Sequence, residues 1–393
     1  MKEVFIVGMA RTPVGAFGGA LSSLSVVDLG VVAVKGAMER AGISPEVVDE
    51  LYMGNVLQAN VGQAPAKQVA IGAGLGNNIP STTINKVCAS GMKSIMLAAQ
   101  NIRLGDADIV IAGGMESMSN APFYIPKARF GYKYGDASLI DAVVRDGLQD
   151  PYDRSMMGMA GEHCAVEKNI TREDQDDFAI ESYKRAQNAQ ENGFFDSEIV
   201  PVSIPQRKGD PKVIDTDEEP GRANFEKMRS LRTAFKKDGT ITAANASKLN
   251  DGAAAVVLAS KEKVEELGLK PLAKVVSYAD ASQEPIWFTT TPSKAMPKAI
   301  HKAGLQQSDI DFFEINEAFS CVTIANNKEL NLDPAIVNVF GGAVSLGHPI
   351  GCSGARITMA LVNVLQRKKG RYGCAGICNG GGGASSIVIE QIN

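Results

Sequence analysis

An internal repeat constrains the fold of this chain more than any other feature of its sequence. The segment Ala41–Asn55 matches Ala303–Glu317 at a constant separation of 262 positions, and Cys88–Lys93 matches Gly351–Arg356 at a separation of 263. Two copies of one α/β unit are the economical explanation for both matches. A pseudo-twofold axis between the copies would bring together the N-termini of the helices that follow the second pair of segments.

Short apolar strands alternate with helical patterns near both ends of the chain, as is typical of α/β proteins. Val4–Val7 and Ile109–Ala112 predict buried strands. Between residues 121 and 245 the pattern gives way to polar stretches and clustered aromatic residues, with one clear helix at Thr171–Glu191. Because 393 residues exceed the roughly 250–300 that one hydrophobic core supports, we expect two domains or two fused halves. The change of pattern adds an insertion, so the chain divides into three parts. These are an N-terminal half (1–120 and 246–270), an inserted loop domain (121–245) and a C-terminal half (271–393).

The composition excludes several classes of partner. A formal net charge of −4 provides no basic field for nucleic acid or for an anionic membrane. No apolar run reaches the length that crosses a bilayer, and the N-terminus enters a strand at Val4–Val7 without a targeting segment. Six cysteines scattered through a long chain are typical of free thiols in a reducing compartment. We therefore expect a cytoplasmic protein with no nucleic-acid or membrane partner.

Cys88 lies between a predicted strand and a predicted helix and is the first candidate for chemistry. Ser81–Ile84 is short and rich in β-branched residues, and the apolar residues from Met92 to Ala99 recur at helical spacing. At a helix N-terminus, unpaired N–H groups and the positive end of the helix dipole favour the thiolate, which is the nucleophilic form. The alternative is that Cys88 is a small buried hydrophobic residue, as most free cysteines are.

The corresponding turn of the second copy holds one of only three histidines. This residue, His348, stands in the glycine-rich segment Gly341–Gly354. Because the pseudo-twofold axis makes this turn face Cys88, we predict that His348 is the base that activates the thiol. A lone histidine is more often structural than catalytic, and we assign a structural role to His163 and His301.

Cys378 and Asn316 complete the predicted constellation. Cys378 ends an apolar strand and precedes the glycine run Gly380–Gly383, whose backbone N–H groups can approach a ligand closely. This run is not a Walker or dinucleotide-binding loop, because the lysine and the acidic residue that those motifs require are missing. Asn316 follows a strand of the second copy. Its side chain can orient a water or donate to an oxyanion, although a role in capping a turn or helix stays open.

Together these motifs resemble the thiolase family, in particular its short-chain acetyl-CoA acetyltransferase branch. The resemblance covers the whole chain. Its most specific motifs, in the family's order, are Asn85–Ser94, Gly113–Ser119, Thr242–Ser247, Asn316–Phe319, Gly341–Gly354 and Cys378–Gly383. The resemblance implies an α/β thiolase fold of two repeated five-layered α-β-α-β-α halves with an inserted loop domain. It also implies an acyltransferase of fatty acid metabolism that forms a homo-oligomer, either a dimer or a tetramer.

The resemblance implies a reversible Claisen condensation of two acetyl-CoA molecules to acetoacetyl-CoA and CoA, or thiolysis of a short 3-ketoacyl-CoA in reverse. Cys88, deprotonated by His348, takes the acyl group, and Cys378 removes an α-proton from a second acetyl-CoA. The covalent intermediate divides one difficult step into two easier ones. One oxyanion hole is expected at His348 and a water held by Asn316, and the other at the N–H groups of Cys88 and Gly380. Loss of one such donor typically costs about 3 kcal/mol.

Coenzyme A is then a substrate and a product, and no tightly bound cofactor is expected. Matching family positions imply that it is bound by Leu148, Met157, Arg222, Lys227, Phe235, Ser247, Ala318 and Phe319. A potassium-responsive branch of the family holds K⁺ near a tyrosine and an alanine-rich loop. The residues that match that site, and that make K⁺ stimulation an expectation here, are Tyr183, Ala243, Ala244, Ala246 and Val344.

One motif departs from the family pattern, and several alternatives stay open. Many short-chain members carry His-Met-Gly where this chain has Met156–Gly158, so a broader-range 3-ketoacyl-CoA thiolase is one alternative. A decarboxylating ketoacyl synthase usually needs a second histidine, and here Cys378 stands at that position. The remaining alternatives are a non-catalytic CoA-binding or lipid-binding member of the fold and a redox switch that pairs Cys378 with Cys374 or Cys88.

Overall fold

A ten-stranded sheet runs through the protein, of which the computed structural model describes residues 1–392. Its strands are β1 (Val4–Arg11), β2 (Gly15–Ala16), β3 (Glu50–Gly54), β4 (Ser81–Ile84), β5 (Ile109–Ser117), β10 (Asn250–Ser260), β11 (Ala273–Ser282), β12 (Phe312–Ile315), β13 (Tyr372–Asn379) and β14 (Gly383–Gln391). The order across the sheet is β12-β13-β14-β11-β1-β10-β5-β3-β4, with β2 paired to β10. The two copies join where Phe5 and Ile6 of β1 pair with Lys274 and Ala273 of β11.

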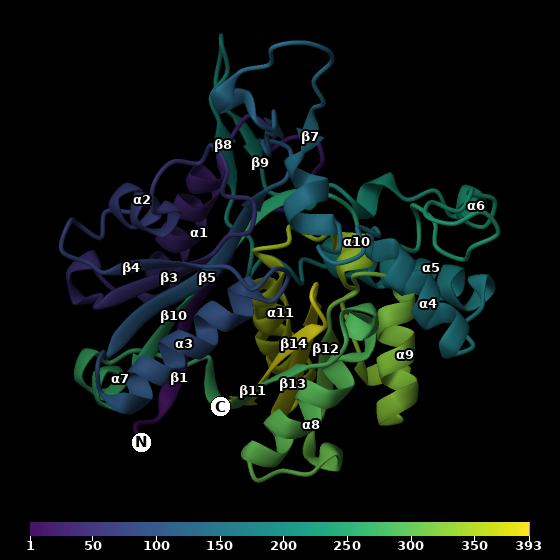
Figure 1. The fold of residues 1–393 in the computed structure, drawn as a ribbon. Helices are drawn as coiled ribbons and strands as arrows, with labels where there is room; N and C mark the ends of the chain where they lie inside the picture. The colour runs from purple at the N-terminus through teal and green to yellow at the C-terminus, as the bar shows by residue number, and fades with distance from the viewer. Residues whose placement is uncertain (393) are drawn as a thin grey trace.

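Helices form three layers around the two halves of this sheet, so that the molecule has five layers in all (Figure 1). The helices outside the central insertion are α1 (Val26–Ala41), α2 (Pro65–Gly72), α3 (Ser90–Leu104), α7 (Lys261–Leu267), α8 (Pro292–Lys302), α9 (Ser320–Leu330), α10 (Ala343–Leu346) and α11 (Ser353–Lys368). Helices α1 and α2 pack on the outer face of the first half, and α8 packs on the outer face of the second. Helices α3 and α11 pack together between the halves. The five layers therefore belong to the whole molecule, because the two halves share the middle layer.

The repeat predicted from the sequence is present in equivalent elements of the two halves. Strand β3 runs parallel to its neighbours β4 and β5, as β12 does to β13. Helices α3 and α11 meet at their first turns, where a Cβ added to Gly91 would lie 2.8 Å from the Ala355 nitrogen. A Cβ on Gly354 would lie 2.4 Å from the Met92 nitrogen. Only glycine allows such an approach, so the predicted meeting of the two helix N-termini is confirmed.

Between β5 and β10 the chain leaves the sheet and packs against both halves. This segment contains β6 (Phe123–Tyr124), β7 (Ile140–Asp141), α4 (Met157–Glu167), α5 (Arg172–Glu191), β8 (Val202–Ile204), β9 (Lys212–Ile214) and α6 (Phe225–Met228). Helix α5 begins as predicted, because Thr171 and Asp174 form a reciprocal capping box. Helices α4 and α5 contact α9, and α5 also contacts α10 (Figure 1). The limits of this segment as a separate domain stay a prediction.

Candidate active site

Cys88 lies on a strained turn between β4 and α3. The preceding residue, Val87, has a φ of 49°, a left-handed conformation that is costly for a β-branched side chain. Ser90 holds the turn, because its Oγ accepts from the Lys86 N–H at 2.8 Å and donates to the Val87 carbonyl at 2.6 Å. Cys88 keeps part of its surface exposed. The turn therefore leaves Cys88 partly open to its surroundings.

Packing around the sulfur of Cys88 favours its protonated thiol. Burial of the sulfur raises the pKa of Cys88 to about 12, and the backbone N–H groups of Gly380 and of Cys88 itself oppose the rise. Burial therefore disfavours the thiolate that we expected at this helix end. Loss of hydration outweighs the two N–H groups, because segments distant in the sequence pack around the sulfur.

His348 lies in the loop between α10 and α11 with its imidazole buried. Its Nδ1 is 2.6 Å from the Oγ of Ser353, which itself donates to the Pro349 carbonyl at 3.0 Å. Because the hydroxyl hydrogen is directed to that carbonyl, Ser353 accepts the Nδ1 hydrogen and Nε2 is left unprotonated. Burial lowers the pKa of His348 to about 3, and Nε2 has no hydrogen-bond partner within residues 1–392. The imidazole is therefore neutral and has a free acceptor for a proton.

Cys378 and Asn316 are both buried. Burial raises the pKa of Cys378 well above the usual thiol value, and the neighbouring Cys88 sulfur adds to the rise. The side-chain nitrogen and oxygen of Asn316 are both buried without a partner among residues 1–392. A helix-capping role for Asn316 is wrong, because α9 begins at Ser320 and has no side-chain cap. An amide with two unpaired buried atoms is costly unless a water or ligand satisfies it.

Glu116 joins the two halves at the site and was not assigned a role from the sequence. Its carboxylate accepts from the N–H of Gly351 at 2.9 Å, of Val56 at 3.1 Å and of Leu57 at 3.0 Å. Burial raises the pKa of Glu116 to about 7, and these donors oppose the rise. A carboxylate at the end of a wholly apolar strand is the sequence signal that could have revealed it.

The other two histidines lie outside this centre. His163 on α4 is packed edge-on against the Trp287 ring, with 4.6 Å between ring centroids. His301 on α8 is exposed. Neither residue lines either of the two cavities described next.

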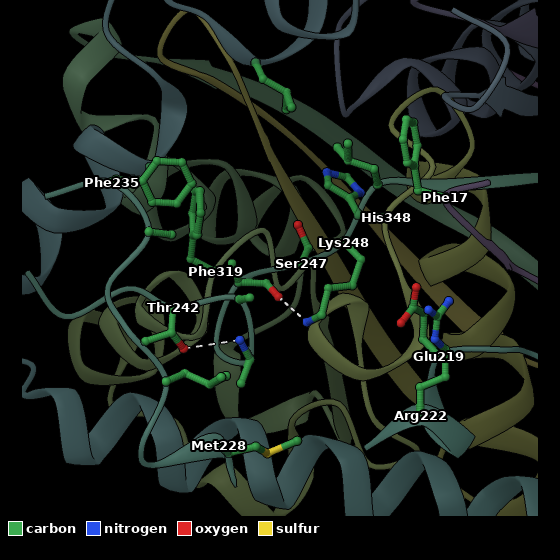
Figure 2. A pocket seen from close by; sticks show the side chains of 18 of the residues that line it. Phe17, Glu219, Arg222, Met228, Phe235, Thr242, Ser247, Lys248, Phe319 and His348 are labelled. Carbon is green, nitrogen blue, oxygen red and sulfur yellow. Dashed lines mark hydrogen bonds between the residues drawn. The ribbon is translucent and has the colours of Figure 1, made fainter. Parts of the chain in front are cut away.

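A cavity of about 710 Å³ has His348 in its wall (Figure 2). Of the residues predicted to bind coenzyme A, those that line the cavity are Leu148, Met157, Arg222, Lys227, Phe235, Ser247 and Phe319. Ala318 lies behind the wall, where its carbonyl accepts from the Ser247 N–H at 3.1 Å. In Figure 2 Phe235 and Phe319 lie on one side of the pocket and Arg222 on the other.

The predicted potassium residues lie in the same wall. Those that line the cavity are Tyr183, Ala243, Ala244 and Ala246. Val344 is buried and packs with Tyr183 and Ala244 just outside it. A second cavity, of about 690 Å³, includes Val87, Gly380 and Met157. Met157 lines both cavities, and Val87, the residue before Cys88, lines the second.

Two family descriptions match consecutive parts of the chain. "Thiolase, N-terminal domain" matches residues 4–262, and "Thiolase, C-terminal domain" matches residues 269–391. The chain belongs to the thiolase family. The family and the fold predicted from the motifs are therefore confirmed.

Relatives resemble this thiolase over its whole length. An acetyl-CoA acetyltransferase of Schizosaccharomyces pombe is 57% identical and covers 99% of both chains. The acetyl-CoA acetyltransferase ERG10, cytosolic, of Gibberella zeae is 55% identical, over 100% of this chain and 99% of its own. The Acat5 thiolase from Ascaris suum, solved in complex with coenzyme A, has a TM-score of 0.95 and 48% identity, with both chains fully covered.

Proposed function

We propose that this thiolase is an acetyl-CoA C-acetyltransferase, which condenses two acetyl-CoA molecules reversibly to acetoacetyl-CoA and CoA through an acyl-Cys88 intermediate. Its family and the names of its relatives support the activity. One observation carries the mechanism: the Cys88 sulfur lies beside both the Gly380 N–H and the buried Cys378. In this proposal the nucleophile Cys88, the second thiol of Cys378 and the N–H donor of Gly380 are neighbours.

In the first half-reaction the Cys88 sulfur attacks the thioester carbonyl of acetyl-CoA, and its proton passes to Nε2 of His348. The unprotonated Nε2 suits it as acceptor. The carbon–sulfur bond to CoA then breaks, and the CoA thiolate leaves with a proton as free thiol. Cys88 is left as the acetyl thioester.

In the second half-reaction the Cys378 thiol first gives its proton to His348, and the resulting thiolate removes an α-proton from another acetyl-CoA. The carbanion attacks the acetyl group on Cys88, a carbon–carbon bond forms, and the Cys88 thiolate leaves and takes the proton held by His348. Both half-reactions place negative charge on a thioester oxygen. We assign one such oxygen to the N–H groups of Cys88 and Gly380, and the other to His348 and a water held by Asn316. The two unpaired amide atoms of Asn316 support that water.

Coenzyme A fits the large cavity in this proposal. The apolar residues Leu148, Met157, Phe235 and Phe319 form a passage for the pantetheine arm. Arg222 and Lys227 are exposed in the same wall, where their charges suit the phosphates of the nucleotide.

Trapping the intermediate tests the function. The protein is incubated with acetyl-CoA, digested, and its peptides are weighed. We expect acetyl groups on Cys88 during turnover. If Cys88 stays unmodified while acetoacetyl-CoA is produced, the mechanism is wrong; if neither product nor acetyl-Cys88 forms, the chain is a CoA-binding member of the fold without turnover.

Cys378 is tested against a matched cysteine of the same strand. Cys378→Ala should still acetylate Cys88 but lose carbon–carbon bond formation, because only the proton acceptor is missing. Cys374 is equally buried on β13, and Cys374→Ala should keep both half-reactions. Loss of both half-reactions in Cys378→Ala alone would show that its role is assigned wrongly.

Finer properties are part of the same proposal. Met156 lines the cavity, so the acyl-chain preference is measured with a series of 3-ketoacyl-CoA lengths; equal rates on longer chains favour the broader-range thiolase. A relative is named cytosolic, and we extend a cytoplasmic location to this chain, to be checked by cell fractionation. No helix within residues 1–392 is long and apolar enough to cross a membrane. A homotetramer, with a dimer as alternative, is distinguished by light scattering.

A further inference from the structure

Lys248 reaches into the wall of the large cavity at the site where the family resemblance places K⁺. Its Nζ donates to the carbonyl oxygen of Ala246 at 2.6 Å and to that of Val344 at 3.2 Å. Figure 2 draws a dashed line from the end of the Lys248 side chain. Two of the residues matched to the potassium site, Ala246 and Val344, therefore already accept hydrogen bonds from a positively charged side chain of this protein.

The surroundings of Lys248 are those of a cation site. The ammonium lies 5.6 Å from the centre of the Tyr183 ring, within the range of a cation–π contact. Glu219 and Glu317 lie near enough for their charges to favour the charged ammonium, which opposes the effect of burial. Burial lowers the pKa of Lys248 to about 8. Tyr183, also buried, keeps its phenol protonated, because burial and the same carboxylates raise its pKa.

The residues present do not fit a potassium ion while Lys248 stays in place. A carbonyl oxygen that receives an N–H at 2.6 Å directs one of its two lone pairs at the ammonium. A second cation on the same oxygens would lie within about 5 Å of the first, where two unit charges repel by about 3 kcal/mol even at an effective dielectric constant of 20.

We propose that the Lys248 ammonium is the resident cation of this site and makes the thiolase independent of K⁺. Lys248 then acts as a positioning residue. It ties the segment Thr242–Ser247, which lines the cavity, to Val344, which stands four residues before His348. The part of this inference that concerns turnover rests on the proposed function.

Two variants separate the charge of Lys248 from its bulk. Lys248→Ala removes both and leaves room at the carbonyl oxygens for an ion. Lys248→Met fills the same space without a charge and is the matched control. Wild type and both variants are compared in KCl and NaCl at equal ionic strength, with the thermal unfolding midpoint and kcat/KM for acetoacetyl-CoA thiolysis as separate readouts.

Wild type should unfold at the same temperature and react at the same rate in the two salts. Lys248→Ala should lose stability and activity in NaCl and recover both in KCl, with kcat/KM rising about tenfold as is typical of an effector site. Because binding to the folded state alone raises the midpoint, that rise should saturate with the K⁺ concentration. Lys248→Met should be impaired equally in both salts.

Any rise specific to K⁺ in the wild-type midpoint or rate overturns the proposal, as does a Lys248→Ala variant that is indifferent to the two salts. If Lys248→Ala does not fold in either salt, the wild-type comparison decides. The unfolding midpoint needs no turnover. A chain without thiolase activity whose Lys248→Ala variant is stabilised by K⁺ therefore refutes the proposed function and keeps this inference.

Discussion

One methyl group added at Gly114 should move the two halves of the active site apart. A Cβ on this residue of β5 would lie 2.0 Å from the carbonyl oxygen of Gly351 and 3.0 Å from the Cα of Gly91. Both obstacles are backbone atoms, which cannot rotate away as the end of a side chain can. Gly114→Ala must therefore push the turn that contains Gly351 away from the sheet.

The size of that displacement follows from the contact itself. Cβ contacts under 3.0 Å essentially never occur, so the Gly351 oxygen has to retreat by about 1 Å from its 2.0 Å position. Gly351 lies between His348 and Ser353, and the His348 imidazole is hydrogen-bonded to the Ser353 hydroxyl. The imidazole should therefore move with the turn. A shift of about 1 Å between reacting groups can cost about 100-fold in rate. Overpacking of the core should lower the free energy of unfolding by about 1–3 kcal/mol.

The assay is kcat/KM for acetoacetyl-CoA thiolysis, together with the rate of acetyl transfer to Cys88 in a single turnover. Gly252→Ala on the neighbouring strand β10 is the control, because a Cβ there meets nothing closer than 3.4 Å. Gly252→Ala should keep nearly full activity. If Gly114→Ala matches it in both measurements, the close approach of the two halves does not set the geometry of the site.

Four further variants probe the donor, the core and the buried carboxylate. Gly380 contributes a backbone N–H, and an added Cβ would meet nothing closer than 3.6 Å, so Gly380→Ala should keep activity. Gly380→Pro, which deletes the N–H, should lower kcat by about 100-fold or more, and equal losses in the two variants would contradict the assignment. Arg11 is buried and pairs with Glu198 at 2.7 Å and Asp217 at 2.8 Å. Arg11→Met should lower the free energy of unfolding, measured in urea, by about 3–5 kcal/mol. A loss below about 1 kcal/mol would show that these ion pairs do not hold β1 to the segments of Glu198 and Asp217. The pKa of Glu116 in the folded protein, about 7, lies above its ordinary value of 4.5, so the folded protein binds the proton more tightly than the unfolded chain does. The contribution of this group to stability is therefore lost as pH rises from about 5 to 7. Glu116→Gln should remove this pH dependence of the free energy of unfolding. If the free energy of unfolding changes with pH in the same way in variant and wild type, the assignment is contradicted.

The parts of the fold that could be predicted are those encoded by local and repeated patterns. The duplication, the helix beginning at Arg172 and the meeting of α3 with α11 all follow from short motifs and glycine positions. The sequence predicted that the N-termini of α3 and α11 meet, but not that the two helices form a single middle layer shared by both halves, because that layer depends on packing along their whole length. The same applies to the pairing of β1 with β11, which involves only Phe5 and Ile6 and carries no pattern of its own.

The active site divides in the same way. Cys88, His348 and Cys378 could be found because each stands in a turn or glycine-rich motif that is visible in the sequence. Glu116 and Lys248 were missed as participants, because their partners come from segments far away in the chain. The individual roles of all these residues stay predictions until the variants are measured.

The protonation states of the resting site bear on the alternative of a redox switch. Disulfide exchange and oxidation both begin from a thiolate, and burial raises the pKa of Cys88 to about 12 and that of Cys378 well above its usual value. Two neighbouring thiols that stay protonated react slowly with oxidants at neutral pH, in spite of their proximity. Reactivity then has to arise when a thioester binds, because the N–H groups of Cys88 and Gly380 stabilise negative charge only where a carbonyl oxygen is placed against them. A site built in this way protects its nucleophile between turnovers, which favours catalysis over redox sensing as the reason for two adjacent cysteines.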